Sequence, residues 1–110
     1  MKIEHKADYT LVTSNEDSFS DFFRNFESEY QNFTGKNLII AISQHFNIAN
    51  KNILLFLKYA HEHQDNGMSF VLILKDVDID EFPETFNIVP TLVEAEDVIE
   101  MENIQRDLGF

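Results

Sequence analysis

Aromatic residues define the first predicted helix. Over residues 19–33 they recur at i, i+3, i+4, i+7, i+11 and i+14, which is the spacing of an amphipathic helix with one buried face. Ser18 is a suitable N-cap for this helix, and Gly35 is a suitable stop. The residues of this aromatic stripe are Phe19, Phe22, Phe23, Phe26, Tyr30 and Phe33.

Two further helices are predicted downstream. The second spans residues 50–64, with Asn50 as its cap and Gly67 beyond its end. Its centre reads ILLFL and is apolar almost all round, so we expect more than one of its faces to be buried. The third spans residues 94–108, and its early glutamates suit the positive end of a helix. The apolar positions of the third helix are Val98, Met101, Ile104 and Leu108.

The strands are predicted from short apolar runs. Residues 37–43 and 69–74 are almost entirely apolar, which is typical of parallel strands that are covered on both faces. Residues 3–6 and 9–13 predict a hairpin joined by a two-residue turn. Residues 88–93 contain a proline, so they predict an edge strand or a final strand.

The order of these elements predicts the fold class. Strands that alternate with helices favour parallel pairing through right-handed crossovers. We therefore expect an α/β fold: a mixed sheet of about five strands, mostly parallel after the N-terminal hairpin, packed with three main helices. The 110 residues, 1–110, fit a single domain.

The composition is that of a globular protein, because 44% of the residues are hydrophobic and eleven of them are phenylalanines. Cysteine is absent, which excludes disulfides and thiolate metal sites. The first ten residues lack the apolar region of a signal peptide, and no apolar run is long enough to span a membrane. We therefore expect a soluble, cytoplasmic protein without a membrane partner.

Negative charge is concentrated near the C-terminus. The net charge is −12, and residues 76–110 contain eleven acidic residues against one basic residue, Arg106. Nucleic-acid binding requires a basic surface, so we expect no nucleic-acid partner. The acidic surface fits either simple solubility or a basic protein partner.

Residues 61–66, HEHQDN, contain the candidate metal ligands His61, His63 and Asp65. They resemble the His-x-His-x-Asp-His motif of the metallo-β-lactamase hydrolases, which include ribonuclease Z, but Asn66 replaces the last histidine. On a helix, side chains two residues apart point about 200° apart, so the two histidines cannot share a metal ion. We expect them to stabilise the helix C-terminus instead. A metal-dependent hydrolase or nuclease like ribonuclease Z, or an accessory to one, is the alternative.

Other catalytic and metal-binding patterns are incomplete. Asp76, Asp78 and Asp80 match the first three ligand positions of an EF-hand loop, but Glu81 takes the place of its glycine. We interpret this run as a strand end with one solvated face. Neither a nucleophile elbow nor a phosphate-binding glycine loop is present in the sequence. We therefore expect no catalytic residues, no bound metal and no cofactor.

A family resemblance covers nearly the whole chain. Residues 37–73 combine an apolar strand, a short loop, a helix, a glycine and a second apolar strand, and they resemble the STAS domain of the anti-sigma-factor antagonists. Residues 89–100, VPTLVEAEDVIE, are similar to the closing strand and helix of that family. The resemblance implies a domain that works by binding another protein.

The resemblance also implies where the partner binds. In the family, the second helix starts at Asp-Ser-Ser-Gly and offers a serine to a partner kinase, whereas this chain has Ala49, Asn50, Lys51 and Asn52 at that position and no such serine. The family's docking surface corresponds to roughly residues 44–55 here. Its predicted members are Gln44, Phe46, Asn47, Ala49, Asn50, Lys51 and Asn52.

The expected function is therefore that of a non-catalytic, STAS-like interaction or regulatory module. Its expected partner is another protein, either a regulator with a basic face or a kinase-like protein. The second alternative is a self-associating structural protein or homodimer, because the second helix is apolar almost all round.

Overall fold

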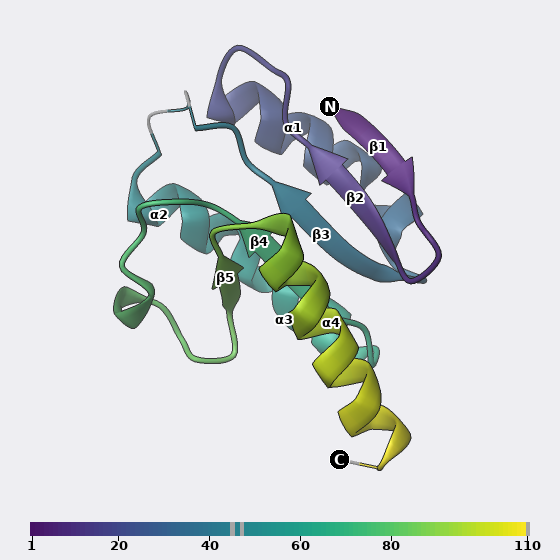
Figure 1. Cartoon of the computed structure of the whole chain (residues 1–110). Helices are drawn as coiled ribbons and strands as arrows, with labels where there is room; N and C mark the ends of the chain where they lie inside the picture. The colour runs from purple at the N-terminus through teal and green to yellow at the C-terminus, as the bar shows by residue number, and fades with distance from the viewer. Residues whose placement is uncertain (45, 47, 110) are drawn as a thin grey trace.

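The strands lie in one sheet in the order of the sequence (Figure 1). The computed structural model describes residues 1–44, 46 and 48–109. The first two strands pair antiparallel, and each later pair of neighbours is parallel. The strands of this 5-stranded sheet are β1 (Lys2–His5), β2 (Tyr9–Thr13), β3 (Asn37–Ala41), β4 (Phe70–Ile73) and β5 (Asn87–Val89).

Helices cover both faces of the sheet. One helix, α4, lies in front of the sheet in Figure 1, and the other helices lie behind it. Short 3-10 segments extend the first helix and interrupt the second, so the described chain contains three main helical segments. The predicted α/β fold class is confirmed. The helical elements are α1 (Phe19–Glu29), η1 (Tyr30–Phe33), α2 (Asn50–Ile53), η2 (Leu54–Phe56), α3 (Leu57–Asp65), η3 (Ile79–Glu81) and α4 (Leu92–Asp107).

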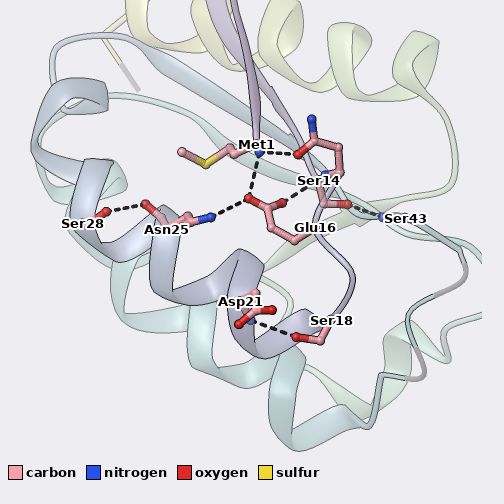
Figure 2. A network of polar contacts seen from close by, with 9 residues as sticks. Met1, Ser14, Glu16, Ser18, Asp21, Asn25, Ser28 and Ser43 are labelled. Atoms are coloured by element: carbon pink, nitrogen blue, oxygen red, sulfur yellow. Dashed lines mark hydrogen bonds and ion pairs between the residues drawn. The ribbon is translucent and has the colours of Figure 1, made fainter.

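The aromatic stripe forms the core behind the sheet. Phe22 and Phe26 of α1 are fully buried, and the Phe26 ring lies 5.3 Å from the Phe56 ring in an edge-on contact. The predicted N-cap is also confirmed, because Oγ of Ser18 accepts a hydrogen bond of 3.1 Å from the backbone N–H of Asp21 (Figure 2). The spacing of the aromatic residues thus fixes which face of α1 packs on the sheet.

The apolar run of β3 is covered on both faces, as predicted. Leu38 and Ile40 pack in the aromatic core with α1, whereas Ile39 packs on the opposite face with α4. Successive side chains of a strand point to opposite faces, so a central strand between two helical layers needs apolar residues at every position.

The second predicted helix differs from the expectation in two respects. It is divided into α2, η2 and α3, and its N-cap is Ala49, so Asn50 is the first helical residue and not the cap. Oδ1 of Asn52 accepts a hydrogen bond of 3.1 Å from the backbone N–H of Ala49. The helix start is therefore stabilised by a side chain of its first turn. The expectation of more than one buried face is wrong, because Leu54 and Leu55 are 42% and 47% exposed. None of the described residues forms a layer outside this helix.

The aspartate-rich run forms a turn and not the predicted strand end. β4 ends at Ile73, and Asp76 has a positive φ of 60°. Oδ1 of Asp78 accepts a hydrogen bond of 3.1 Å from the backbone N–H of Asp80 and so caps η3. The carboxylate of Asp78 therefore helps to shape the backbone between β4 and β5.

The last helix packs through a face that the apolar pattern marks only at Val98. Ala95 and Ile99 are buried against the sheet and the half-buried Val98 packs against them, whereas Met101, Ile104 and Leu108 are exposed. The inner face of α4 continues with polar residues, so a search for apolar spacing selects the outer face instead. Within the described chain, no helix combines the length and the apolar composition that a membrane crossing requires.

Candidate functional site

The two histidines of HEHQDN point in different directions. His63 is only 1% exposed and lies in the core, whereas His61 and Asp65 are exposed on the outer side of α3. The helical geometry therefore separates the two imidazoles, as the spacing predicts. The structure does not bring the three candidate ligands together.

Both ring nitrogens of His63 have hydrogen-bond partners from other elements. Nδ1 lies 2.6 Å from the hydroxyl oxygen of Tyr30, and Nε2 lies 3.2 Å and 3.1 Å from the carbonyl oxygens of Phe33 and Lys36. Carbonyl oxygens only accept, so the ring donates from Nε2 and accepts the Tyr30 hydroxyl at Nδ1. Burial lowers the pKa of His63, although the bonds to the two carbonyls act in the opposite direction. His63 is therefore a neutral core residue. Its hydrogen-bond partners belong to η1 and to Lys36, before β3, and not to the C-terminus of α3 that the sequence predicted.

No group of three or more His, Cys, Asp or Glu side chains is arranged to hold a metal ion among residues 1–44, 46 and 48–109. His5 lies on β1, where Nδ1 is 3.5 Å from Oγ1 of Thr10. His45 is outside the described residues.

A cavity opens where the parallel strands β3 and β4 end. Its volume is about 210 Å³. The carboxyl ends of neighbouring parallel strands are the usual place for a binding site in an open α/β sheet. The cavity is lined by residues that follow β3, by the start of α2, and by residues that follow β4: Ser43, Gln44, Phe46, Ile48, Asn50, Ile53, Leu74, Lys75, Asp76 and Val77.

Hydrogen bonds between strand ends hold the base of this cavity. Oγ of Ser14, just after β2, accepts a bond of 2.7 Å from the backbone N–H of Ser43, as Figure 2 shows. The backbone N–H of Ser14 donates to the carbonyl of Ala41, and that of Ile42 donates to the carbonyl of Ile73. The ends of β2, β3 and β4 are thus tied together below the surface loops.

A second polar network lies beside Ser14 in Figure 2 and fixes the loop that leads into α1. The carboxylate of Glu16 accepts hydrogen bonds from the amino group of Met1 at 2.8 Å and from Nδ2 of Asn25 at 2.7 Å. The backbone N–H of Asn15 adds a third bond of 3.0 Å. Burial acts to raise the pKa of Glu16, but these hydrogen bonds outweigh it and lower the pKa to about 2.

The predicted docking residues fall into three groups. Gln44, Ala49, Asn50 and Lys51 are exposed, and Asn52 is half-buried. Phe46 is buried, and its ring lies 6.4 Å from that of Phe22, so it anchors the loop to the core and is not part of the surface. Asn47 lies outside the described residues.

The second half of the site comes from residues that sequence reasoning missed. Leu74, Lys75, Asp76 and Val77 line the same cavity from the end of β4, and Nδ2 of Asn50 donates a hydrogen bond to the carboxylate of Glu81. The apolar runs of β3 and β4 are the sequence signal that could have located these residues. They predict parallel strands, and the carboxyl ends of neighbouring parallel strands lie at the same edge of the sheet.

The cavity and the exposed start of the helix are suited to binding. The lining offers amide groups, one ammonium group on Lys75 and one carboxylate on Asp76 next to apolar side chains. Leu54 and Leu55 of η2, which follow Ile53 in the chain, are exposed apolar side chains. We call the exposed residues of the segment 44–55 the docking surface: Gln44, Ala49, Asn50, Lys51, Leu54 and Leu55.

Comparison of the chain with protein-family models finds no match. Comparison with curated proteins finds no match either.

Proposed function

We propose that this chain is a non-catalytic, STAS-like module of the cytoplasm that binds another protein through the docking surface. The observation that carries the proposal is the exposure of Leu54 and Leu55, at 42% and 47%, next to the exposed Lys51. Two adjacent exposed leucines on a helical segment are an apolar surface that a partner protein can bury. The mixed sheet and the order of its helices are consistent with the STAS resemblance.

The chemistry of the docking surface indicates what the partner must offer. Leu54 and Leu55 require an apolar surface, and Lys51 requires a carboxylate or carbonyl oxygen beside it. A regulator with a basic face also suits this chain, because its net charge is −12, and a kinase-like partner is what the STAS resemblance implies.

Regulation through a phosphoserine is not part of the proposal. The helix starts with Asn50 and Lys51, and the side chain of Asn50 is bonded to Glu81 of η3. Since no serine stands at residues 49–52, the proposed interaction does not depend on a phosphorylation step at this helix start.

A quantitative pull-down from the source cells tests the proposal. We expect a partner protein in a stoichiometric amount, and we expect at least about tenfold weaker recovery with Lys51→Glu and with Leu55→Ser, which change exposed positions. Lys2→Glu is the matched control, because its side chain is 65% exposed on β1, away from the docking surface. Failure to recover a partner, or equal recovery with all three variants, contradicts the proposal. Circular dichroism verifies that each variant is folded.

A further inference from the structure

The outer face of α4 carries large apolar side chains that no described element covers. Val93, Met101, Ile104 and Leu108 are 67%, 59%, 53% and 67% exposed. Met101, Ile104 and Leu108 are separated by three and four residues, so they form one stripe along the helix, whereas the exposed Asp97 lies between Val93 and Met101 on the same face. In Figure 1 the C-terminal turns of α4 extend beyond the end of the sheet. Met101, Ile104 and Leu108 therefore point away from the sheet on the exposed side of this helix.

The inner face of α4 packs on the sheet without contributions from Met101, Ile104 or Leu108. Ala95 and Ile99 pack on the sheet. Nη2 of Arg106 donates hydrogen bonds to Oγ of Ser69 at 3.1 Å and to Oδ1 of Asn103 at 2.5 Å. The apolar stripe is thus not needed to hold α4 against the sheet.

The charges around the stripe all have one sign. The exposed charged residues of α4 are carboxylates, whereas the single basic residue of the helix, Arg106, is half-buried and directed toward Ser69. At helical spacing, Glu100 and Asp107 lie along one edge of the stripe, and Asp97 lies one turn before Met101 on the same face. The exposed carboxylates of α4 are Glu94, Glu96, Asp97, Glu100 and Asp107.

We propose that the outer face of α4 is a second docking surface, which binds a basic amphipathic helix of a partner protein. An apolar stripe of such a helix buries Met101, Ile104 and Leu108, and lysines or arginines beside it pair with the bordering carboxylates. With 16 residues, α4 offers about 24 Å for helix-on-helix packing.

Charge excludes a second copy of the chain as the occupant. Two copies of α4 packed face to face bring only carboxylates opposite carboxylates, and like charges across an interface oppose association. With a basic helix this repulsion is absent, and its lysines or arginines form ion pairs with the carboxylates of α4. The surface lies on the sheet face opposite α2, so it is independent of residues 44–55.

Fluorescence anisotropy with a labelled 18-residue peptide of leucine and lysine, with leucines at helical spacing, tests the proposal. We expect the double variant Met101→Ser/Ile104→Ser to bind this peptide at least about tenfold more weakly than the wild type. Ile79→Ser is the matched control, because Ile79 is 60% exposed on η3. This variant should bind the peptide as tightly as the wild type does. A scrambled peptide of the same composition should bind at least about tenfold more weakly than the amphipathic one.

Three results would overturn this assignment. They are equal binding of the scrambled peptide, unchanged binding by the folded double variant, and a dimer in sedimentation experiments that Met101→Ser/Ile104→Ser abolishes. Lys51→Glu should leave peptide binding unchanged. A failure of the proposal for α4 is therefore distinguishable from a failure of the proposal for residues 44–55.

Discussion

The hydroxyl oxygen of Tyr30 lies 2.6 Å from Nδ1 of His63, inside the core between η1 and α3. This contact fills the one acceptor position of the neutral ring, while Nε2 is directed at two backbone carbonyls. A buried polar side chain is tolerated only when its hydrogen bonds are satisfied, and here all of them are. The histidine that best matches a metal-ligand motif thus has a structural explanation.

The stability of the protein should depend on the protonation of His63. Burial holds the pKa of His63 below its ordinary value of 6.5, so as the pH falls the unfolded chain binds the proton first. The contribution of His63 is therefore full above about pH 6.5 and is lost as the pH falls below that value. Urea unfolding at about pH 7.5 and about pH 5.5 should show this loss. The loss should be smaller in His63→Gln, whereas His61→Gln, the exposed control, should keep it. An equal pH dependence in both variants contradicts the argument.

Removing the hydroxyl of Tyr30 should lower the free energy of unfolding more than removing the hydroxyl of Tyr59. Tyr30→Phe leaves the buried Nδ1 of His63 without a donor, and an unsatisfied buried group costs about 1–3 kcal/mol. Tyr59→Phe removes a bond to the carboxylate of Glu27, which water can replace at that less buried position. Urea unfolding of both variants at neutral pH measures the difference. A loss for Tyr59→Phe that equals or exceeds the loss for Tyr30→Phe would be the opposite of what this geometry requires.

The fold was predictable from sequence because its strongest signals are local. The aromatic spacing in α1 and the apolar run of β3 each reflect the burial of the segment itself. The exposure of Leu54, Leu55 and Ile104 was not predictable in this way. It depends on whether another element lies over them, which periodicity within one helix does not report.

The candidate site was only half predictable for a related reason. The helix start at Lys51 follows from the order of the elements, whereas Lys75 and Asp76 reach the same cavity through the parallel register of β3 and β4. The partners of His63 are a second example, since the carbonyls of Phe33 and Lys36 lie about 30 residues earlier in the chain. Contacts at such separations leave no pattern in a short sequence window.

The carboxylate of Glu16 should stabilise the fold at neutral pH but not in acid. Its pKa is about 2 in the folded protein, against an ordinary value of 4.5, so its contribution is present above about pH 4.5 and is lost as the pH falls toward about 2. Hydrogen bonds to a charged group contribute about 1.5–3 kcal/mol, and we expect Glu16→Gln to lower the free energy of unfolding at pH 7 by about that amount. Asp17→Asn makes the same charge change at an exposed neighbouring position and is the control.

Unfolding curves at two pH values separate these effects. The difference between the wild type and Glu16→Gln should shrink between about pH 4.5 and about pH 2, whereas Asp17→Asn should stay within about 0.5 kcal/mol of the wild type at neutral pH. A Glu16→Gln deficit that is constant with pH would mean that the charge of Glu16 is not what stabilises the loop before α1.

Asn37, the first residue of β3, should be as important for stability as a large core residue. Its Oδ1 accepts a hydrogen bond of 2.7 Å from the backbone N–H of Ser69, and its Nδ2 donates one of 3.0 Å to the carbonyl of Asp8. One amide thus joins the amino ends of β2, β3 and β4. Asn37→Ala leaves both backbone groups without these partners, which should lower the free energy of unfolding by about 2–4 kcal/mol in urea titrations.

The control for Asn37→Ala is Asn32→Ala, which removes an exposed amide that is bonded to the nearby Glu29 and should change stability by less than about 0.5 kcal/mol. Asparagine before an apolar run is usually interpreted as the boundary of a strand, because its side chain competes for backbone hydrogen bonds. Here the same property connects three strands where the apolar core ends. If Asn37→Ala were as mild as Asn32→Ala, the apolar residues of β3 alone would align the strands, and the hydrogen bonds of Asn37 would add no stability.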